Sequence, residues 1–420
     1  MRFVCMIGVL MRLETLNKYL LTVKPAVLVL VGVYLLNTDP GFSQSSQEGE
    51  VLSESEVKTV LDDAPFVSVR AAGMGGALST LADGIHAPFY NPAGIGGIHW
   101  GRRKAPIVRQ LHFPYLGFAA NENATELNRE FKANEDSTNR IIGKAIVDAN
   151  AGKRQYARAS GLVSLVVSRL TFLQYQDSQI AAFRKSDETD GEISAAIRNQ
   201  SGTGFGFSIS DSKETLYLGA FSSFNYRRVF SGDFNYDQLV RQEERKAFFV
   251  PKQKKYTGMS SNAGMIWVMG NYGRPSLALV SKNLGGALYH YEGDSALVTP
   301  EEKTIEDKEN ITLGFSLSPK VGKHGAFNFI IEGQHLMEKE IALNKKFRTA
   351  VELNLGGFGS EALFGVRAGY NLAGASLGFS LNLDLVQFEF ASLAEDIGID
   401  NRHVVERRNM GVFSVNVLYE

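Results

Sequence analysis

Alternation of apolar and polar residues is the feature that most constrains the fold of this chain. In 347–355, apolar residues stand at every second position between polar or small ones, as Phe347, Val351 and Leu353 stand against Arg348 and Glu352. The same period of two recurs from about residue 161 to the C-terminus, in segments of about nine to eleven residues, which is enough to cross a bilayer at a tilt. A period of two is typical of β-strands rather than helices, so the sequence predicts an all-β fold.

Two all-β architectures fit this pattern. A soluble sandwich buries its apolar face, whereas a transmembrane barrel turns its apolar face to lipid and its polar face inward. The barrel is favoured because an export signal precedes a body without cysteine, since Cys5 is the only one, and because the chain ends inside a strand at Tyr419. The net charge of −1 gives no electrostatic reason to expect nucleic-acid binding.

The alternating segments predict an antiparallel barrel of about 14 strands, an even number. Splitting 376–391 into two strands puts the long loops 231–256, 284–309 and 392–409 on the side opposite the C-terminus, which would be extracellular. In a variant interpretation, 111–119 is also a barrel strand, which would disturb this parity. The predicted strands are 161–173, 179–185, 192–199, 203–210, 215–230, 262–270, 275–283, 311–318, 326–336, 347–355, 362–370, 376–382, 385–391 and 410–419.

The region before the barrel divides into four parts. Residues 1–43 are expected to be a signal peptide, with an apolar core at 26–36, although an uncleaved anchor and a start at Met11 stay open. Residues 44–69 are expected to be a polar periplasmic segment. Residues 99–160 are expected to be a linker in which apolar residues at helical spacing in 121–159 predict one or two amphipathic helices, in the periplasm or in the lumen.

The stretch 70–98 lies between them and is predicted to be a compact plug, or hatch. It is too rich in glycine for a stable helix, yet it holds apolar residues that can pack. Pro92 fixes its own φ and restricts Asn91 to extended conformations, Asn91 can close a turn with its side chain, and Gly94 permits the reversal. The candidate hatch residues are Arg70, Gly73, Gly75, Gly76, Asp83, Asn91, Pro92, Ala93 and Gly94.

Charged residues fall on the inward face of the predicted strands. They are Glu332, Arg348, Glu352, Arg367, Asp384 and Glu389. They can form a polar permeation route, or they can form cross-strand ion pairs that stiffen a filled barrel, as buried charges require. The ion-pair interpretation is favoured.

No constellation of residues indicates catalysis, a metal or a cofactor. Residues 374–378 match the Gly-x-Ser-x-Gly pattern of serine hydrolases, but that motif needs a helix after it and here a strand follows. The histidines show no metal-ligand spacing. Basic residues in 240–255 lie in a predicted outer loop, which is either simply solvated or in contact with anionic lipopolysaccharide.

Residues 69–77, Ala82-Asp83-Gly84 and 89–94 together closely resemble the N-terminal signature of the FadL-like outer-membrane transport superfamily. Residues 365–370, 376–380 and 388–391 resemble the closing strands of its PorV-like and TraF-like branch. The resemblance implies a 14-stranded barrel with an N-terminal hatch in its lumen, and places Asn91, Pro92 and Ala93 in that hatch.

Three functional hypotheses follow. The first is a passive outer-membrane channel for hydrophobic small molecules, fatty-acid-like or aromatic, gated by the hatch, which needs no cofactor and binds its ligand in the lumen. The second is a PorV-like structural or secretion-assisting barrel whose outer loops bind protein partners. The third is a soluble secreted β-protein. An enzyme is not expected, because no acid–base or nucleophile arrangement emerges.

Overall fold

The computed structural model describes most of the chain after residue 65. The described residues are 66–95, 109–124, 153–184, 192–235, 253–293 except 271, 298–339 except 323, 341–397 except 358, 360, 361 and 384, and 404–419. The predicted signal peptide, nearly all of the predicted periplasmic segment and most of the 121–159 helices lie outside these residues.

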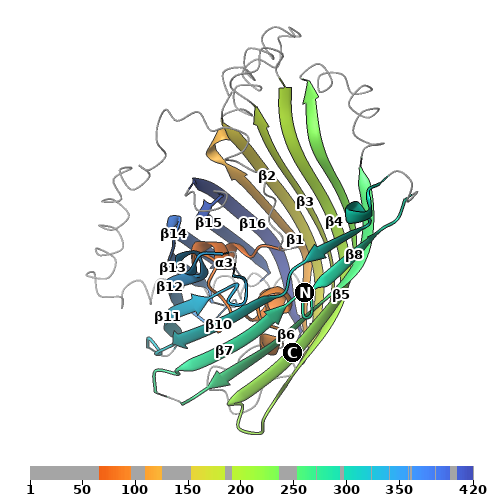
Figure 1. Ribbon diagram of the computed structural model, residues 1–420. Helices are drawn as coiled ribbons and strands as arrows, with labels where there is room; N and C mark the ends of the chain where they lie inside the picture. The colour runs from red at the N-terminus through yellow and green to blue at the C-terminus, as the bar shows by residue number, and fades with distance from the viewer. Residues whose placement is uncertain are drawn as a thin grey trace.

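Sixteen antiparallel strands form one continuous sheet that closes on itself (Figure 1). The strands β8 and β9 form a side hairpin on β6, and the remaining fourteen close the barrel through the β5–β6 and β1–β16 pairings. The strands are β1 (Arg109–Asn121), β2 (Arg154–Val167), β3 (Leu170–Arg184), β4 (Glu192–Ser210), β5 (Leu216–Asn235), β6 (Lys254–Val268), β7 (Ser276–Lys282), β8 (Ala287–Tyr291), β9 (Thr304–Asp307), β10 (Asn310–Leu317), β11 (Gly325–Gly333), β12 (Phe347–Leu355), β13 (Phe364–Asn371), β14 (Gly374–Asn382), β15 (Val386–Asp396) and β16 (Val405–Tyr419).

The predicted barrel of 14 strands is confirmed. Two differences in the individual strands, one added strand and one pair that is a single strand, leave this total unchanged. The barrel begins at Arg109 and not at residue 161, because β1 pairs with both β16 and β2. The 99–160 linker is therefore wrong over 109–121 and 154–160. Pro114 interrupts the alternation of β1. The register of β1 shifts between His112 and Tyr115, and at such an irregularity the missing N–H of proline is tolerated.

The second difference concerns 192–210, which is one strand and not two. The four residues 199–202 are all polar or glycine and resemble a turn, yet β4 stays in register with β3 and β5 throughout. The predicted strand 161–173 in turn spans the end of β2, a two-residue turn at Ser168 and Arg169, and the start of β3. No glycine, proline or asparagine marks that turn in the sequence.

The barrel wall has a tall side and a short side (Figure 1). Strands β2–β6 contain 14 to 20 residues each, whereas β7 and β10–β14 contain 7 to 9. Strand β6 extends beyond its pairing with β7, and this extension, at residues 256–258, pairs with β8. The β8–β9 hairpin therefore continues the tall side past the end of β7. The turn between β2 and β3 and the long connection between β5 and β6 lie at opposite ends of the barrel, as the predicted parity requires.

The two faces of the wall differ in the sense expected for a membrane barrel. Large apolar side chains point outward and are exposed, as Phe118 (63%), Phe224 (62%) and Met259 (60%) are. Polar and charged side chains point inward and are buried, including Glu332, Glu352 and Arg367. A water-soluble barrel would have the opposite arrangement. Among the described residues, none of the helices is long and apolar enough to span a membrane.

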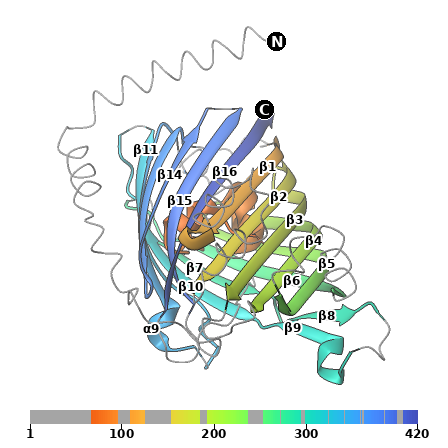
Figure 2. The same ribbon diagram turned by 90° about the horizontal axis from the view of Figure 1, so that it is seen from above.

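Residues 66–95, the luminal segment, fill part of the barrel interior (Figures 1 and 2). They form α3 (Val69–Gly73), η2 (Gly84–His86), α4 (Ala87–Tyr90) and η3 (Pro92–Gly94). Helix α3 packs against β14 and β15, and η3 packs against β4, β5 and β6. Apolar residues of the segment and of the wall make one core that includes Phe66, Met74 and Leu78. The packed segment thus begins at Phe66 at the latest, earlier than the expected boundary at residue 70.

Candidate functional site

The luminal segment is held in shape by its own caps and turns. Ser68 caps α3, since its hydroxyl accepts a hydrogen bond from the backbone N–H of Ala71, and its own N–H donates to the hydroxyl of Tyr90. All four helices are one turn or slightly more, too short to be stable alone in water. Their structure therefore depends on packing against the barrel, which leaves nearly every described side chain of the segment buried.

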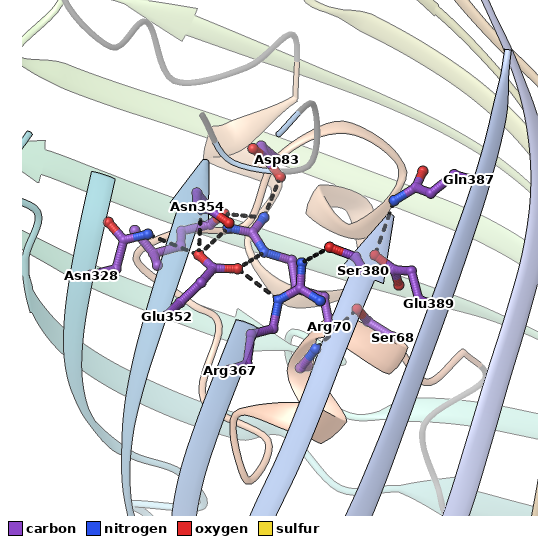
Figure 3. A network of polar contacts seen from close by, with 12 residues as sticks. Ser68, Arg70, Asp83, Asn328, Glu352, Asn354, Arg367, Ser380, Gln387 and Glu389 are labelled. Carbon is purple, nitrogen blue, oxygen red and sulfur yellow. Dashed lines mark hydrogen bonds and ion pairs between the residues drawn. The ribbon is translucent and has the colours of Figure 1, made fainter. Parts of the chain in front are cut away.

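Arg70 joins the segment to the short side of the wall (Figure 3). Its guanidinium donates from Nε and Nη2 to the two carboxylate oxygens of Glu352 on β12, at 2.7 and 2.8 Å. Its Nη1 donates to Asp83, at 2.7 Å, and to the carbonyl of Leu81. This paired, two-point contact is the strongest geometry available to an arginine and a carboxylate.

Glu352 is shared by both sides of the contact. Besides Arg70 it accepts from Arg367 on the neighbouring strand β13, at 2.8 Å, and from Asn328 on β11 and Asn354 on its own strand. Glu352 and Arg367 are register partners, so their ion pair is cross-strand. Two guanidinium groups and the carboxylates of Glu352 and Asp83 balance in charge, as buried ions require.

A second contact lies toward the end of the short wall where β11 ends. The carboxylate of Glu332 accepts hydrogen bonds from the backbone N–H groups of Leu78, at 3.0 Å, and Ser79, at 2.8 Å. Arg348, its register partner on β12, donates to the carbonyl of Gly75. Four of the inward charges named from the sequence, Glu332, Arg348, Glu352 and Arg367, therefore contact the segment or one another. Asp384 lies outside the described residues.

Glu389 lies beside this network without joining it (Figure 3). It accepts a hydrogen bond from Gln387, two residues earlier on β15, at 3.0 Å. Its second oxygen, Oε2, is buried and has no hydrogen-bond partner. The carboxylate therefore faces the interior with unused capacity to accept a hydrogen bond.

The turn at Asn91, Pro92, Ala93 and Gly94 joins the segment to the opposite, tall wall. The Asn91 side chain accepts from the N–H of Ala93 at 3.1 Å and donates to the carbonyls of Ser79 and of Met265 on β6. The hydroxyl of Ser208 on β4 donates to the carbonyl of Ile95. Pro92 and Ala93 belong to the short helix η3, which Asn91 caps.

Glycines allow the backbone of the segment to reach the wall. A Cβ on Gly369 of β13 would lie 2.1 Å from the carbonyl carbon of Met74. Of the candidate hatch glycines, Gly75 and Gly76 adopt positive φ values of 62° and 92°. A Cβ on Gly73 would lie 2.9 Å from the Cα of Gly378, and one on Gly94 would lie 1.8 Å from the carbonyl oxygen of Ala82.

The tall wall meets the segment with aromatic rather than charged side chains. Phe66 stacks on Phe89 with ring centroids 4.8 Å apart and lies 5.3 Å from Tyr115 of β1. Phe89 contacts Tyr175 of β3 and Phe221 of β5, each at 5.6 Å. The contacts of the segment are therefore two-sided, charged on the short wall and aromatic on the tall wall, although the tall wall also carries buried ion pairs.

Several buried polar residues were not singled out from the sequence. Asn328, Asn354 and Ser380 complete the network around Glu352 and Arg367. On the tall wall, Arg158 pairs with Asp177 at 2.6 Å and Arg227 pairs with Asp307 of β9. Their inward positions follow from the same alternation, which is the signal that could have found them.

Other predicted features fall mostly outside the described residues. Of the basic residues in 240–255, Lys254 and Lys255 are described, and Lys254 pairs with Glu302 at 2.5 Å. The Gly-x-Ser-x-Gly match is strand β14, with Ser376 buried. In the part of the chain that the structure describes, no cluster of three or more histidine, cysteine, aspartate or glutamate side chains could hold a metal ion.

No family model and no curated protein matches this sequence. Solved barrels match the fold. The toluene transporter TbuX of Ralstonia pickettii is 11% identical with a TM-score of 0.45, over 85% of this chain and 100% of that one. The CymD monoaromatic hydrocarbon channel is 12% identical with a TM-score of 0.46, over 86% and 99%.

The toluene transporter TodX of Pseudomonas putida is 11% identical with a TM-score of 0.42, over 83% of this chain and 96% of that one. These structures are aromatic hydrocarbon transporters of the FadL family, which the sequence motifs also resemble. At such identities the likeness concerns the fold.

Proposed function

We propose that the chain is an outer-membrane channel that passes hydrophobic small molecules by diffusion, with the luminal segment as its hatch. The observation that carries this proposal is the two-sided contact of the segment with the wall. Phe66 and Phe89 of the segment and Tyr115, Tyr175 and Phe221 of the wall form a connected aromatic surface between the two. Such a surface can contact an apolar or aromatic solute as it passes.

The outward face supports the location in a membrane. Exposed leucine, phenylalanine and isoleucine side chains cover strands on both the tall and the short side of the barrel. In water such a surface would aggregate, whereas in a bilayer it is solvated by acyl chains. Contact of the basic residues in 240–255 with lipopolysaccharide belongs to the same proposal.

The hatch role follows from how the segment is held. Charged contacts bind it to β11 and β12, and the Asn91 turn binds it to β4 and β6. The aromatic contacts between them involve no hydrogen bonds and are individually weak, about 0.5–1.5 kcal/mol for a ring pair. A solute can therefore compete for the aromatic surface while both anchors persist.

The test is uptake of hydrophobic fluorescent probes into liposomes that contain the purified barrel. Asn91→Ala removes the contacts to Ser79 and Met265 and should change the rate of uptake. The control is Asn409→Ala, which alters an exposed asparagine on the outward face of β16. The proposal fails if the native barrel admits no hydrophobic probe faster than empty liposomes do, or if Asn91→Ala leaves every rate unchanged.

A second candidate is a structural or secretion-assisting barrel that binds a protein partner. The feature that favours it is the β8–β9 hairpin, in which β9 pairs with β8 on one edge and ends the sheet. An open strand edge can accept a strand from another protein. Copurification of a stoichiometric partner that is lost when 284–309 is shortened would support this candidate, and its absence from purified membranes would count against it.

A further inference from the structure

One sector of the inner wall carries a row of buried hydrogen-bonding groups that have no partner among the described residues. His112 has no partner for either ring nitrogen, and neither the hydroxyl of Tyr115 nor that of Ser164 has one. The Oγ of Ser414, the Oδ1 of Asn416 and the Oε2 of Glu389 are also without a partner. Each of these residues is 5% exposed or less.

These residues are neighbours in space because strand register places them together. His112 of β1 is the register partner of Asn416 on β16 and of Ser164 on β2. Tyr115 is the partner of Ser414, and Ser414 is in turn the partner of Gln387 on β15. The groups therefore form one patch that spans β15, β16, β1 and β2.

Among the hydrogen bonds between described residues, none joins the luminal segment to this same sector of the wall. The wall hydrogen bonds recorded for the segment come from β4, β6, β11, β12, β13 and the residue that follows β11. Toward β15, β16, β1 and β2, the segment presents apolar residues such as Phe66, together with His86, whose Nδ1 is also buried without a partner.

A buried polar group without a hydrogen bond costs about 1–3 kcal/mol, and native proteins satisfy nearly all such groups with protein atoms or ordered water. One isolated exception needs no explanation, but a contiguous patch does. Donors and acceptors are mixed in the patch, which suits water and other small uncharged molecules that bear hydroxyl groups.

We propose that a hydrated seam runs between the luminal segment and β15–β16–β1–β2, and that it passes water and small hydroxylated solutes while the hatch stays anchored. The ring of Tyr115 borders both the seam and the aromatic surface, which otherwise involves β3 and β5. The seam provides a polar route beside the hydrophobic one, and it gives the unused groups of His112, Asn416 and Glu389 their hydrogen-bond partners.

The first test asks whether the seam holds water, and it uses the unaltered chain. Radiolytic labelling of the folded barrel oxidises side chains that adjoin bound water. Tyr115 and Tyr175 are both 2% exposed, so bulk solvent reaches them equally. Tyr175 packs against the ring of Phe89, on another part of the wall. Tyr115 should be labelled clearly above Tyr175, and equal labelling of the two rings would overturn the proposal.

The second test asks whether the seam conducts. Stopped-flow shrinkage of liposomes measures water permeability, and re-swelling in glycerol measures solute entry. Asn416→Leu puts an apolar group into the patch and should bring both rates toward those of empty liposomes. Asn409→Leu, on the outward face of the same strand, should leave them unchanged.

Heat-modifiable migration on gels checks that each variant is a folded barrel. If the folded Asn416→Leu and Asn409→Leu variants have the same permeability, the seam is not a route. Because the probes are water and glycerol, this result is independent of whether hydrophobic probes enter, so failure of the seam and failure of the proposed channel are distinguishable.

Discussion

Glu352 is the residue on which the attachment of the luminal segment depends most. It lies at 0% exposure between Arg70 from the segment and Arg367 from the wall. Removing one member of a buried ion cluster leaves the others charged and without a counter-ion. This destabilises a protein more than replacing the whole cluster by apolar residues does. The network is therefore fragile to single changes although it is balanced as a whole.

Replacement of Glu352 by glutamine should destabilise the folded barrel by about 3–5 kcal/mol, because Arg70 and Arg367 would keep their charges in a buried site. The measurement is urea unfolding in detergent micelles. The matched control is Glu214→Gln, since Glu214 pairs with Arg169 at 3.3 Å near the surface and should contribute less than about 1 kcal/mol. Equal effects of the two replacements would contradict this role of Glu352.

At this scale the sequence predicted which residues face inward but not what they meet. The alternation of β12 and β13 indicated that Arg348, Glu352 and Arg367 share a face. Arg70, however, is 282 positions away from Glu352 in the chain. A contact at that separation depends on barrel closure and on the path of the segment, neither of which is encoded in local pattern.

At the scale of elements, the turn between β4 and β5 is organised by Asp211. Its carboxylate accepts hydrogen bonds from the backbone N–H of Leu216, at 2.9 Å, and from the N–H and hydroxyl of Thr215. These bonds favour the charged form and lower the pKa of Asp211, chiefly through the N–H of Leu216. The stabilisation is present above the unfolded-state pKa and is lost as the pH falls through the lower pKa of the folded state.

Thr215→Ala should therefore raise the pKa of Asp211 toward its ordinary value, because the hydroxyl donor is removed while both backbone donors stay. Carbon-detected NMR titration of the aspartate carboxyl in micelles measures this directly. Thr349→Ala, on the exposed outward face of β12, serves as control. An unchanged titration in Thr215→Ala would show that the hydroxyl has no part in the lowered pKa.

The close approach of the segment to β13 gives a second prediction at this scale. Gly369→Ala would place a methyl group 2.1 Å from the backbone of Met74, so the segment must move away from the wall. Limited proteolysis of the folded barrel should then cut within 66–95. Gly411→Ala introduces the same methyl group into β16, where the nearest atom is 4.0 Å away, and should leave the segment protected. Protection in both variants would contradict the tight contact.

Strand boundaries show what local pattern can decide. Outward-facing residues have odd numbers in β2 and even numbers in β3. The two-residue turn at Ser168 and Arg169 therefore breaks the alternation, although it contains no glycine, proline or asparagine. Within 199–202 the alternation continues although both faces are polar. Composition alone misleads at both places, whereas the parity of the exposed side chains identifies the turn and the unbroken strand.

For the whole molecule, the outward apolar face makes a direct prediction about lipid contact. Trp267 on β6 is 47% exposed on that face. In a Trp100→Phe background, which leaves Trp267 as the only tryptophan, lipids with brominated acyl chains should quench its fluorescence. Lipids brominated only in the head group should quench it less, since a side chain within the apolar band lies below the head groups. Absence of quenching by either lipid would favour a soluble barrel.

The sequence by itself determined the class of this fold and, within each unbroken strand, which side chains share a face, because a strand's period of two is a local property that survives in any β-sheet. Only the tertiary structure decided that β1 closes the barrel against β16, that Arg70 binds Glu352, and that β15–β16–β1–β2 leave polar groups without partners. Those facts depend on which distant segments become neighbours when the sheet closes around residues 66–95, and closure is a property of the whole chain.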